Sequence, residues 1–184
     1  VMLDTSGRGL HKRGYRPVGN DAPIRETLAA AMCKLSQLRH YHTMYDPCCG
    51  SGTVLIEGAM LANNIAPGIN RNFDVDRWGF VPESVWMSER ERCHDLIKTD
   101  TDFVAFGTDI DPHAIELTNK NASNINVDKF IRTSVCDVAS FNPTTERGTL
   151  ITNPPYGERM LDIKAAEKLY AVMGKRFERR HGWS

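Results

Sequence analysis

The motif with the most specific chemical meaning is Asn153-Pro154-Pro155-Tyr156-Gly157, near the carboxyl end of the chain. Its two prolines remove two backbone N–H donors and stiffen the chain, so the Asn153 side chain and the Pro154 carbonyl can be fixed hydrogen-bond acceptors. Two such acceptors can hold both N–H bonds of an exocyclic base amine and direct the nitrogen lone pair outward. Tyr156 offers a ring on which an extruded base can lie. The motif predicts four catalytic residues, with an ordinary proline-rich loop as the competing interpretation: Asn153, Pro154, Pro155 and Tyr156.

A glycine-rich turn over residues 46–53 (Asp-Pro-Cys-Cys-Gly-Ser-Gly-Thr) lies between an expected strand and an expected helix. Gly50 and Gly52 allow the backbone to approach a ligand closely, and the helix beginning near Thr53 directs free N–H groups toward it. A phosphate loop would need a lysine where Thr53 stands. A dinucleotide site would have its ribose acid about 20 residues further on, whereas no strand-end acid precedes Asp109. A plain strand–helix turn remains the alternative to a cofactor site lined by Asp46, Pro47, Cys48, Gly50, Ser51, Gly52 and Thr53.

Acidic residues follow the next two expected strands. Asp109 can accept hydrogen bonds from both hydroxyls of a ribose, and Ile110 can cover one face of an adenine. Asp111 stands where a helix N-cap is expected, directly before Pro112. Asp137, followed by Val138, could accept the amino group of an adenine; taken alone, a surface aspartate in a loop is the simpler interpretation. Asp109, Ile110, Asp137 and Val138 are therefore further candidate cofactor contacts.

Alternating strands and helices are expected to position these motifs. The pattern predicts a mainly parallel sheet with helices on both faces, the α/β class, in which ligands bind beyond the carboxyl ends of the strands. Each motif falls at such an end. The first helix is expected to bury Ile24, Leu28, Ala31, Met32 and Leu35 on one face. The expected elements are a hairpin over 1–16, strands over 41–46, 103–108, 131–135 and 149–152, and helices following Pro23 and over 53–64, 83–99, 112–124 and 163–177.

Two regions depart from that alternation. Residues 1–20 are predicted to form the hairpin and a linker, and residues 21–184 the main domain. An insertion over about 65–100 interrupts the main domain, with Phe73, Trp78 and Phe80 as its expected anchors.

The composition excludes several classes of protein. Lys and Arg total 23, as do Asp and Glu, so there is no overall basic footprint for nucleic acid. Residues 1–25 nevertheless carry a balance of +3 and residues 164–184 a balance of +4, which could contact phosphates or belong to ordinary surface. Five cysteines and six histidines show no metal-ligand spacing, so we expect no metal and reduced thiols in the cytoplasm. No apolar run approaches the roughly 18 residues of a membrane helix.

Together these motifs resemble the Rossmann-like amino-methyltransferases, and most closely the bacterial large-subunit (23S) ribosomal RNA guanine-N2 methyltransferases that carry a THUMP RNA-binding domain. The resemblance spans nearly the whole chain. The stretches that carry it are residues 3–7, 10–16, 22–29, 66–68, Trp78 and 153–159, together with the glycine turn and the strand-end acids.

That resemblance implies a Rossmann-like class I, three-layer α/β/α fold and S-adenosyl-L-methionine as the cofactor. Asp46, Gly50 and Gly52 would line its methionine end, with residues 25–28, including Thr27, packed over it. Asp109 would bind the ribose, Asp137 the adenine, and residues 153–156 the target base. The family's THUMP domain would precede Val1, and its sheet has seven strands against four here, so we expect a C-terminally truncated fragment. One departure from the family pattern is Cys48-Cys49, where Cys49 is expected to be a buried filler.

Three functions compete at this point. The first is methylation of a guanine N2 in large-subunit ribosomal RNA. The second is methylation of an adenine N6 in DNA or RNA, since the Asn-Pro-Pro-Tyr motif suits either amine. The third is a non-catalytic binding module that keeps the fold, against which the presence of Asp46, Asp109 and Asn153 argues.

Overall fold

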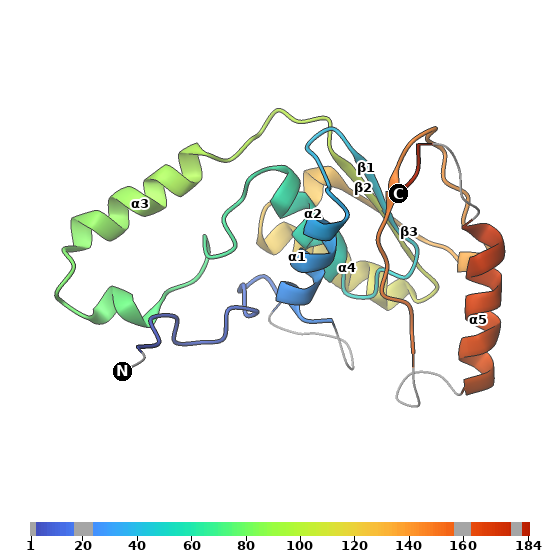
Figure 1. The fold of residues 1–184 in the computed structure, drawn as a ribbon, viewed down its shortest axis with the longest axis horizontal. Coiled ribbons are helices and arrows are strands. Elements are labelled where there is room, and N and C mark those ends of the chain that lie inside the picture. The colour runs from blue at the N-terminus through green and yellow to red at the C-terminus, as the bar shows by residue number, and fades with distance from the viewer. Residues whose placement is uncertain (1–2, 17–23, 157–162, 178–181) are drawn as a thin grey trace.

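The computed structural model describes residues 3–16, 24–156, 163–177 and 182–184. Its centre is a four-stranded sheet in which every pairing is parallel, with the strand order β3-β2-β1-β4 (Figure 1). The α/β class and the four strands predicted from the sequence are confirmed. The strands are β1 (Thr43–Asp46), β2 (Val104–Asp109), β3 (Ile131–Val135) and β4 (Thr149–Leu150).

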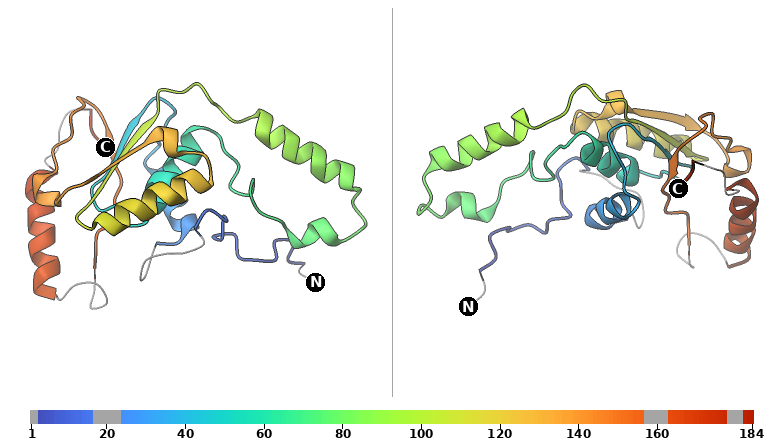
Figure 2. Two further views of the ribbon diagram at one scale, coloured as in Figure 1. Left: turned by 180° about the vertical axis from the view of Figure 1, so that it is seen from behind. Right: turned by 45° about the horizontal axis from the view of Figure 1, so that its top comes forward.

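Helices cover both faces of the sheet. On one face, α2 (Thr53–Ala62) packs against β1 and β2, and α4 (Pro112–Asn124) packs against β2 and β3. Nine of the ten residues of α2 are buried, because α1 (Glu26–Leu35) covers its outer side. The other face carries α5 (Ile163–Arg176), which stands apart from these three helices in Figures 1 and 2. The layers are those of a Rossmann-like α/β/α sandwich.

An aromatic cluster fills the space between the sheet and α5. The Tyr45 ring of β1 stacks on Phe106 of β2, with centroids 5.2 Å apart. Trp183 lies 5.2 Å from the same tyrosine ring, and Phe141 contacts both Tyr45 and Phe177. Trp183 also forms a parallel bridge with Gly148, so residues 182–184 lie along the free side of β4.

The insertion stands away from the sheet (Figure 2). It contains the short helix η1 (Asp74–Arg77) and α3 (Glu83–Asp95), which ends four residues earlier than predicted and has no buried residue. Phe73 lies under the Arg71 guanidinium, and Trp78 is half-buried. Phe80 is 73% exposed, so the prediction that it anchors the insertion was wrong.

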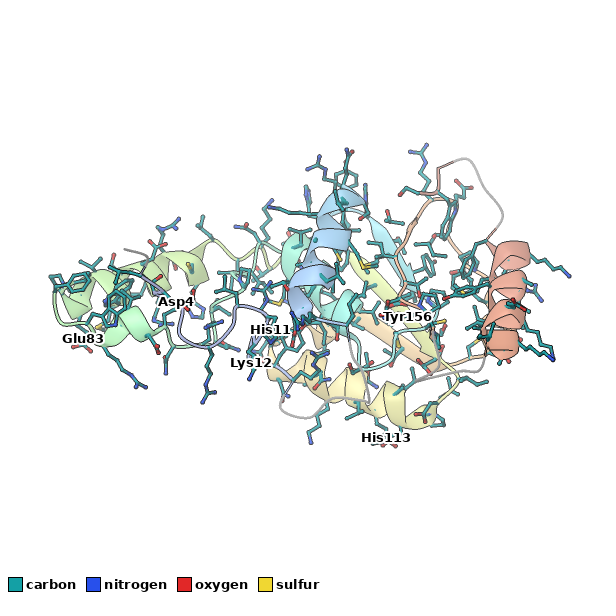
Figure 3. All side chains as sticks on the ribbon, turned by 60° about the horizontal axis from the view of Figure 1, so that its bottom comes forward. Asp4, His11, Lys12, Glu83, His113 and Tyr156 are labelled. Atoms are coloured by element: carbon teal, nitrogen blue, oxygen red, sulfur yellow. The ribbon has the colours of Figure 1, made fainter. Side chains whose placement is uncertain are left out.

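The predicted amino-terminal hairpin is not formed in residues 3–16, which contain no strand. The segment is bonded to the insertion instead, because Arg71 donates to the carbonyls of Ser6, Arg8 and Gly9. Figure 3 shows Asp4 beside the insertion, and His11 and Lys12 where the same segment reaches the body of the domain. The remaining part of the prediction, residues 1–2, lies outside the described residues.

The buried face of α1 also differs from the prediction. Leu28 and Leu35 are 56% and 84% exposed, whereas Ala29 and Cys33 are fully buried. The reason is that α1 packs on another helix rather than on the sheet, and small side chains allow two helix backbones to approach closely. The expected contribution of Met32 is confirmed, because it packs against the core.

Candidate active site at the carboxyl edge of the sheet

The strand order places the predicted site residues in one row. Parallel strands end at the same edge, and the order β3-β2-β1-β4 gives, along that edge, Asp137, Asp109, Asp46 and then Asn153. The glycine turn occupies the middle of the row, after β1. The residues predicted separately from four segments of sequence therefore share one edge.

The glycine turn has the backbone geometry that requires glycine. Gly50 and Gly52 have φ angles of 55° and 80°. A Cβ on Gly52 would lie 2.7 Å from Cγ2 of Thr118 in α4. The Thr118 hydroxyl donates to the Gly50 carbonyl at 2.9 Å, and the Asn121 amide donates to the Ser51 carbonyl at 3.0 Å. Two polar side chains of α4 thus fix the turn.

Asp109 and Asp111 bond different groups, and the predicted N-cap role of Asp111 is confirmed. One carboxylate oxygen of Asp109 accepts from the Gly50 N–H at 2.9 Å and the other from the Asp111 N–H at 3.0 Å. The Asp111 side chain caps α4 by accepting from the His113 N–H at 2.9 Å. Asp109 is half-buried, and each of its oxygens keeps a lone pair. Its carboxylate therefore joins β2 to the glycine turn and can still accept from a ligand.

The other two candidate contacts differ in exposure. Ile110 is 68% exposed beside Asp109, as an apolar cover for a flat ring would be. Asp137 is exposed and caps the short helix η3 (Val138–Ser140) by accepting from the Ala139 N–H at 2.8 Å. Val138 is buried.

A hydrogen bond that the sequence did not predict connects the glycine turn to the proline motif. Asp46 is 1% exposed, and its Oδ1 accepts from the Thr152 hydroxyl at 2.7 Å and from the Cys48 N–H at 3.2 Å. Thr152 directly precedes Asn153. The bond therefore holds the start of the proline motif against the end of β1. The sequence predicts Thr152 only as part of a strand, although it places a hydroxyl directly before the motif.

Burial makes the Asp46 carboxyl group an unusually weak acid, with a raised pKa. Desolvation raises its pKa to about 7, although the hydrogen bonds from Thr152 and Cys48 oppose the shift. A raised folded-state pKa contributes stability that is present below about pH 4 and is lost as the pH rises through about 7. Asp46→Asn keeps a hydrogen-bond acceptor but not the charge. Between about pH 4 and pH 7, we therefore expect its free energy of unfolding to fall much less than that of the wild type. The difference should be on the order of a few kcal/mol.

Urea unfolding at several pH values between 4 and 8 measures that difference. Asp102→Asn, at an exposed carboxylate, is the matched control and should follow the wild type. Parallel stability profiles for wild type and Asp46→Asn would show that the buried carboxyl group is not a source of pH dependence.

The adjacent cysteines are not nucleophiles. Burial raises the pKa of Cys48 to about 12, and burial also raises the pKa of Cys49. Both thiols are therefore protonated at neutral pH. Cys49 is 6% exposed, which confirms the expectation that it is a buried filler.

The proline motif continues toward α5. Asn153, Pro154 and Pro155 are half-buried, and the Pro155 carbonyl accepts from the Tyr170 hydroxyl of α5 at 3.4 Å. Tyr156, labelled in Figure 3, is 63% exposed, so its ring is accessible to a base. The rest of the predicted motif, residues 157–159, lies outside the described residues.

Two buried clusters of charged side chains near the glycine turn were not predicted from the sequence. Arg13 bonds Glu57 with two nitrogens, at 3.3 and 3.4 Å, and the Tyr15 hydroxyl donates to the same carboxylate at 3.0 Å. Burial raises the pKa of Glu57 although Arg13 opposes the shift. A single acid in the otherwise uncharged sequence of α2 was the available signal.

The second cluster joins the first turns of α1 and α2. Arg16 donates to the Thr53 hydroxyl at 2.8 Å and to the Glu26 carboxylate at 2.9 Å. Thr27, the predicted contact in α1, is the exposed neighbour of Glu26. The amino terminus of α1 is therefore fixed beside the glycine turn.

The described residues contain no cluster of three or more His, Cys, Asp or Glu side chains that could hold a metal ion. None of the helices among them has the length and apolar character to cross a membrane. The donor and acceptor groups along the edge are carboxylates, hydroxyls, an amide and free helix N–H groups. These groups fit a nucleoside that carries an amino-acid end.

This fold and edge are those of Rossmann-like methyltransferases. The family model described as "RMKL-like, methyltransferase domain" matches residues 13–184, and the chain belongs to this family. YpsC of Bacillus subtilis, which is named as an RNA methyltransferase, is 39% identical over the whole chain. The ribosomal RNA large subunit methyltransferase K/L of Shewanella frigidimarina is 38% identical over 99% of the chain. The chain spans 48% of the first relative's length and 26% of the second's.

Solved structures agree on the fold. SMU.472, a methyltransferase complexed with SAH (S-adenosylhomocysteine), superposes with a TM-score of 0.89 at 39% identity, covering 99% of this chain and 48% of that one. A predicted N6-adenine-specific DNA methylase from Listeria monocytogenes superposes with a TM-score of 0.91 at 43% identity, covering 98% of this chain and 47% of that one.

Proposed function

We propose that this chain is the catalytic domain of an S-adenosylmethionine-dependent RNA methyltransferase that modifies the exocyclic N2 amine of a guanine in large-subunit ribosomal RNA. The observation that carries the proposal is the hydrogen bond from Thr152 to Asp46. It fixes the Asn-Pro-Pro-Tyr segment beside the glycine turn, so a cofactor and a base could meet at one edge.

Each part of the cofactor has a matching group along that edge. Asp137 and Ile110 would contact the adenine, and Asp109 the ribose hydroxyls. The turn over residues 46–53 and the first turn of α1, with Thr27, would hold the methionine end. SMU.472, a relative at 39% identity, forms a complex with SAH, which supports S-adenosylmethionine as the cofactor. When bound, the cofactor supplies an activated methyl group, so a strong general base is not needed.

The residues of the proline motif would then act on the base. The Asn153 side-chain oxygen and the Pro154 carbonyl would accept hydrogen bonds from the two N–H groups of the amine. This arrangement would direct the nitrogen lone pair toward the methyl group. The exposed Tyr156 ring supports the extruded base by stacking. The amine proton can leave after the transfer.

Ribosomal RNA is favoured as the substrate by the relatives. The named activities of YpsC and of methyltransferase K/L both concern RNA. A THUMP domain before residue 1 and a cytoplasmic location are parts of the same proposal. Adenine N6 is the second candidate, because the motif suits that amine and the Listeria relative is described as an adenine methylase.

Mass spectrometry of nucleosides from a deletion strain separates the two candidates. We expect the large-subunit RNA of that strain to lose one N2-methylguanosine, which returns with the wild-type gene and not with a gene encoding Asn153→Ala. Loss of an N6-methyladenosine from RNA or DNA, with N2-methylguanosine intact, would replace the guanine assignment by the adenine one. An unchanged set of methylated nucleosides would favour a non-catalytic module.

A further inference from the structure

One oxygen of a buried carboxylate beside the glycine turn has no partner. Glu26 is the first residue of α1, and its side chain is 6% exposed. Its Oε1 accepts from Arg16 at 2.9 Å, whereas its Oε2 is inaccessible to solvent and has no hydrogen-bond partner in the described structure. Buried polar atoms in native proteins are nearly always hydrogen-bonded, and an exception calls for an explanation such as a ligand. A carboxylate is a strong acceptor, so the missing partner is a donor.

The position of this oxygen relates it to the cofactor site. The Arg16 guanidinium that bonds Glu26 also bonds the Thr53 hydroxyl at 2.8 Å. Thr53 is the first residue of α2 and directly follows Gly52. Glu26 is thus separated from the glycine turn by a single arginine side chain.

The charges in this region specify the kind of donor. Arg13 and Glu57 form their own pair, to which Tyr15 donates, so that pair is satisfied. Arg16 and the amino terminus of α2 present positive charge next to the glycine turn, which suits a carboxylate. Glu26 presents negative charge beside them, which suits an ammonium group. Opposite charges a few ångströms apart match the two ends of an amino-acid zwitterion.

We propose that Glu26 binds the ammonium group of the cofactor's amino-acid end through Oε2, while Arg16 and the first turn of α2 face its carboxylate. The proposal rests on the proposed function and makes it more specific, because it assigns the α1 contact to the buried residue 26. Thr27 is the contact expected from the sequence, but Thr27 is exposed. The described bonds of the Arg16 guanidinium to side chains go to Glu26 and Thr53 instead.

Calorimetric titration of the full-length protein with two ligands tests this inference. The ligands are S-adenosylhomocysteine and its desamino analogue, in which hydrogen replaces the ammonium group. Glu26→Gln keeps an oxygen for Arg16 but places an N–H donor where the ammonium would bind. We expect this variant to bind S-adenosylhomocysteine roughly 10- to 100-fold more weakly than the wild type does, as a lost charged hydrogen bond implies, and to bind the desamino analogue within about twofold of wild type.

Glu57→Gln is the matched control, since it alters an equally buried glutamate whose partners are already present. It should change the affinities for both ligands by the same factor. Equal losses for both ligands in Glu26→Gln, or no loss, would overturn the inference and leave the proposed function intact. If Glu26→Gln does not fold, Glu26→Asp replaces it, with the same selective loss expected. A wild-type protein that binds neither ligand would instead contradict the proposed function.

Discussion

Asn153→Ala is expected to lower the rate of methyl transfer by about 100- to 1000-fold, the usual effect of removing one hydrogen-bonding group that stabilises a transition state. The alanine removes the acceptor that orients the amine, and Pro154 alone cannot hold both N–H bonds. The affinity for S-adenosylhomocysteine should stay within about twofold, because the proposed cofactor contacts lie in other segments, after β1, β2 and β3 and at the start of α1. Single-turnover transfer of a tritiated methyl group by the full-length protein to ribosomal RNA from the deletion strain measures the rate.

Two further variants make this result specific. Asn153→Asp keeps an acceptor oxygen and should retain more activity than the alanine variant does. Asn142→Ala, at an exposed position in the loop after η3, should behave as wild type. If Asn153→Ala transferred the methyl group at the wild-type rate, the base-holding role of the motif would be excluded.

Asp109→Ala is expected to weaken the binding of S-adenosylhomocysteine by about 100-fold. The variant loses the proposed acceptor for the ribose hydroxyls, and a hydrogen bond to a charged group contributes about 1.5–3 kcal/mol. It also releases the N–H of Gly50, which now donates to this carboxylate at 2.9 Å, and so loosens the glycine turn. Calorimetric titration gives the affinity directly.

Asp111→Ala is the control for this variant, because Asp111 lies two residues away and caps α4. Loss of the cap should cost about 1 kcal/mol of stability and change the affinity little. If the two variants lost affinity equally, the effect would come from α4, and Asp109 would have no separate role at the ribose.

The sheet and its edge could be predicted from the sequence because their signals are local. Short apolar runs that end at glycine, proline or aspartate marked every strand within a few residues, and the parallel arrangement followed from the intervening helices. Once strands are parallel, their carboxyl ends must meet, so Asp46, Asp109, Asp137 and Asn153 could be placed on one edge without coordinates. The helix N-cap at Asp111 was also predictable from a local signal, since Pro112 directly follows it.

Two of the failures involve partners that are distant in sequence. The amino-terminal segment has two short runs on either side of a glycine-containing turn, as a hairpin would, but Arg71, more than sixty residues away, bonds carbonyl groups of that turn. The face of α1 was misassigned because a helix that packs on another helix buries small residues such as Ala29 rather than leucines. Neither the bonds from Arg71 nor the packing of α1 on another helix can be read from the sequence of the segment concerned.

The same limit applies to the candidate site. Asp46 and Thr152 were each visible in the sequence, but 106 residues separate them, and no local pattern joins them. Arg16 bonds groups on two helices, at residues 26 and 53. The residues at the edge are thus predictable from strand ends, whereas the bonds that position them depend on tertiary packing.

A crystal structure of the full-length protein with S-adenosylhomocysteine tests the central claim most directly. The account predicts that the ligand lies along the ends of β3, β2 and β1, with its ribose hydroxyls on Asp109 and its sulfur facing the Asn153 side chain across a space that admits a flat base. A ligand bound away from this edge, or an Asn153 side chain with no room for a ring between it and the sulfur, would contradict the account.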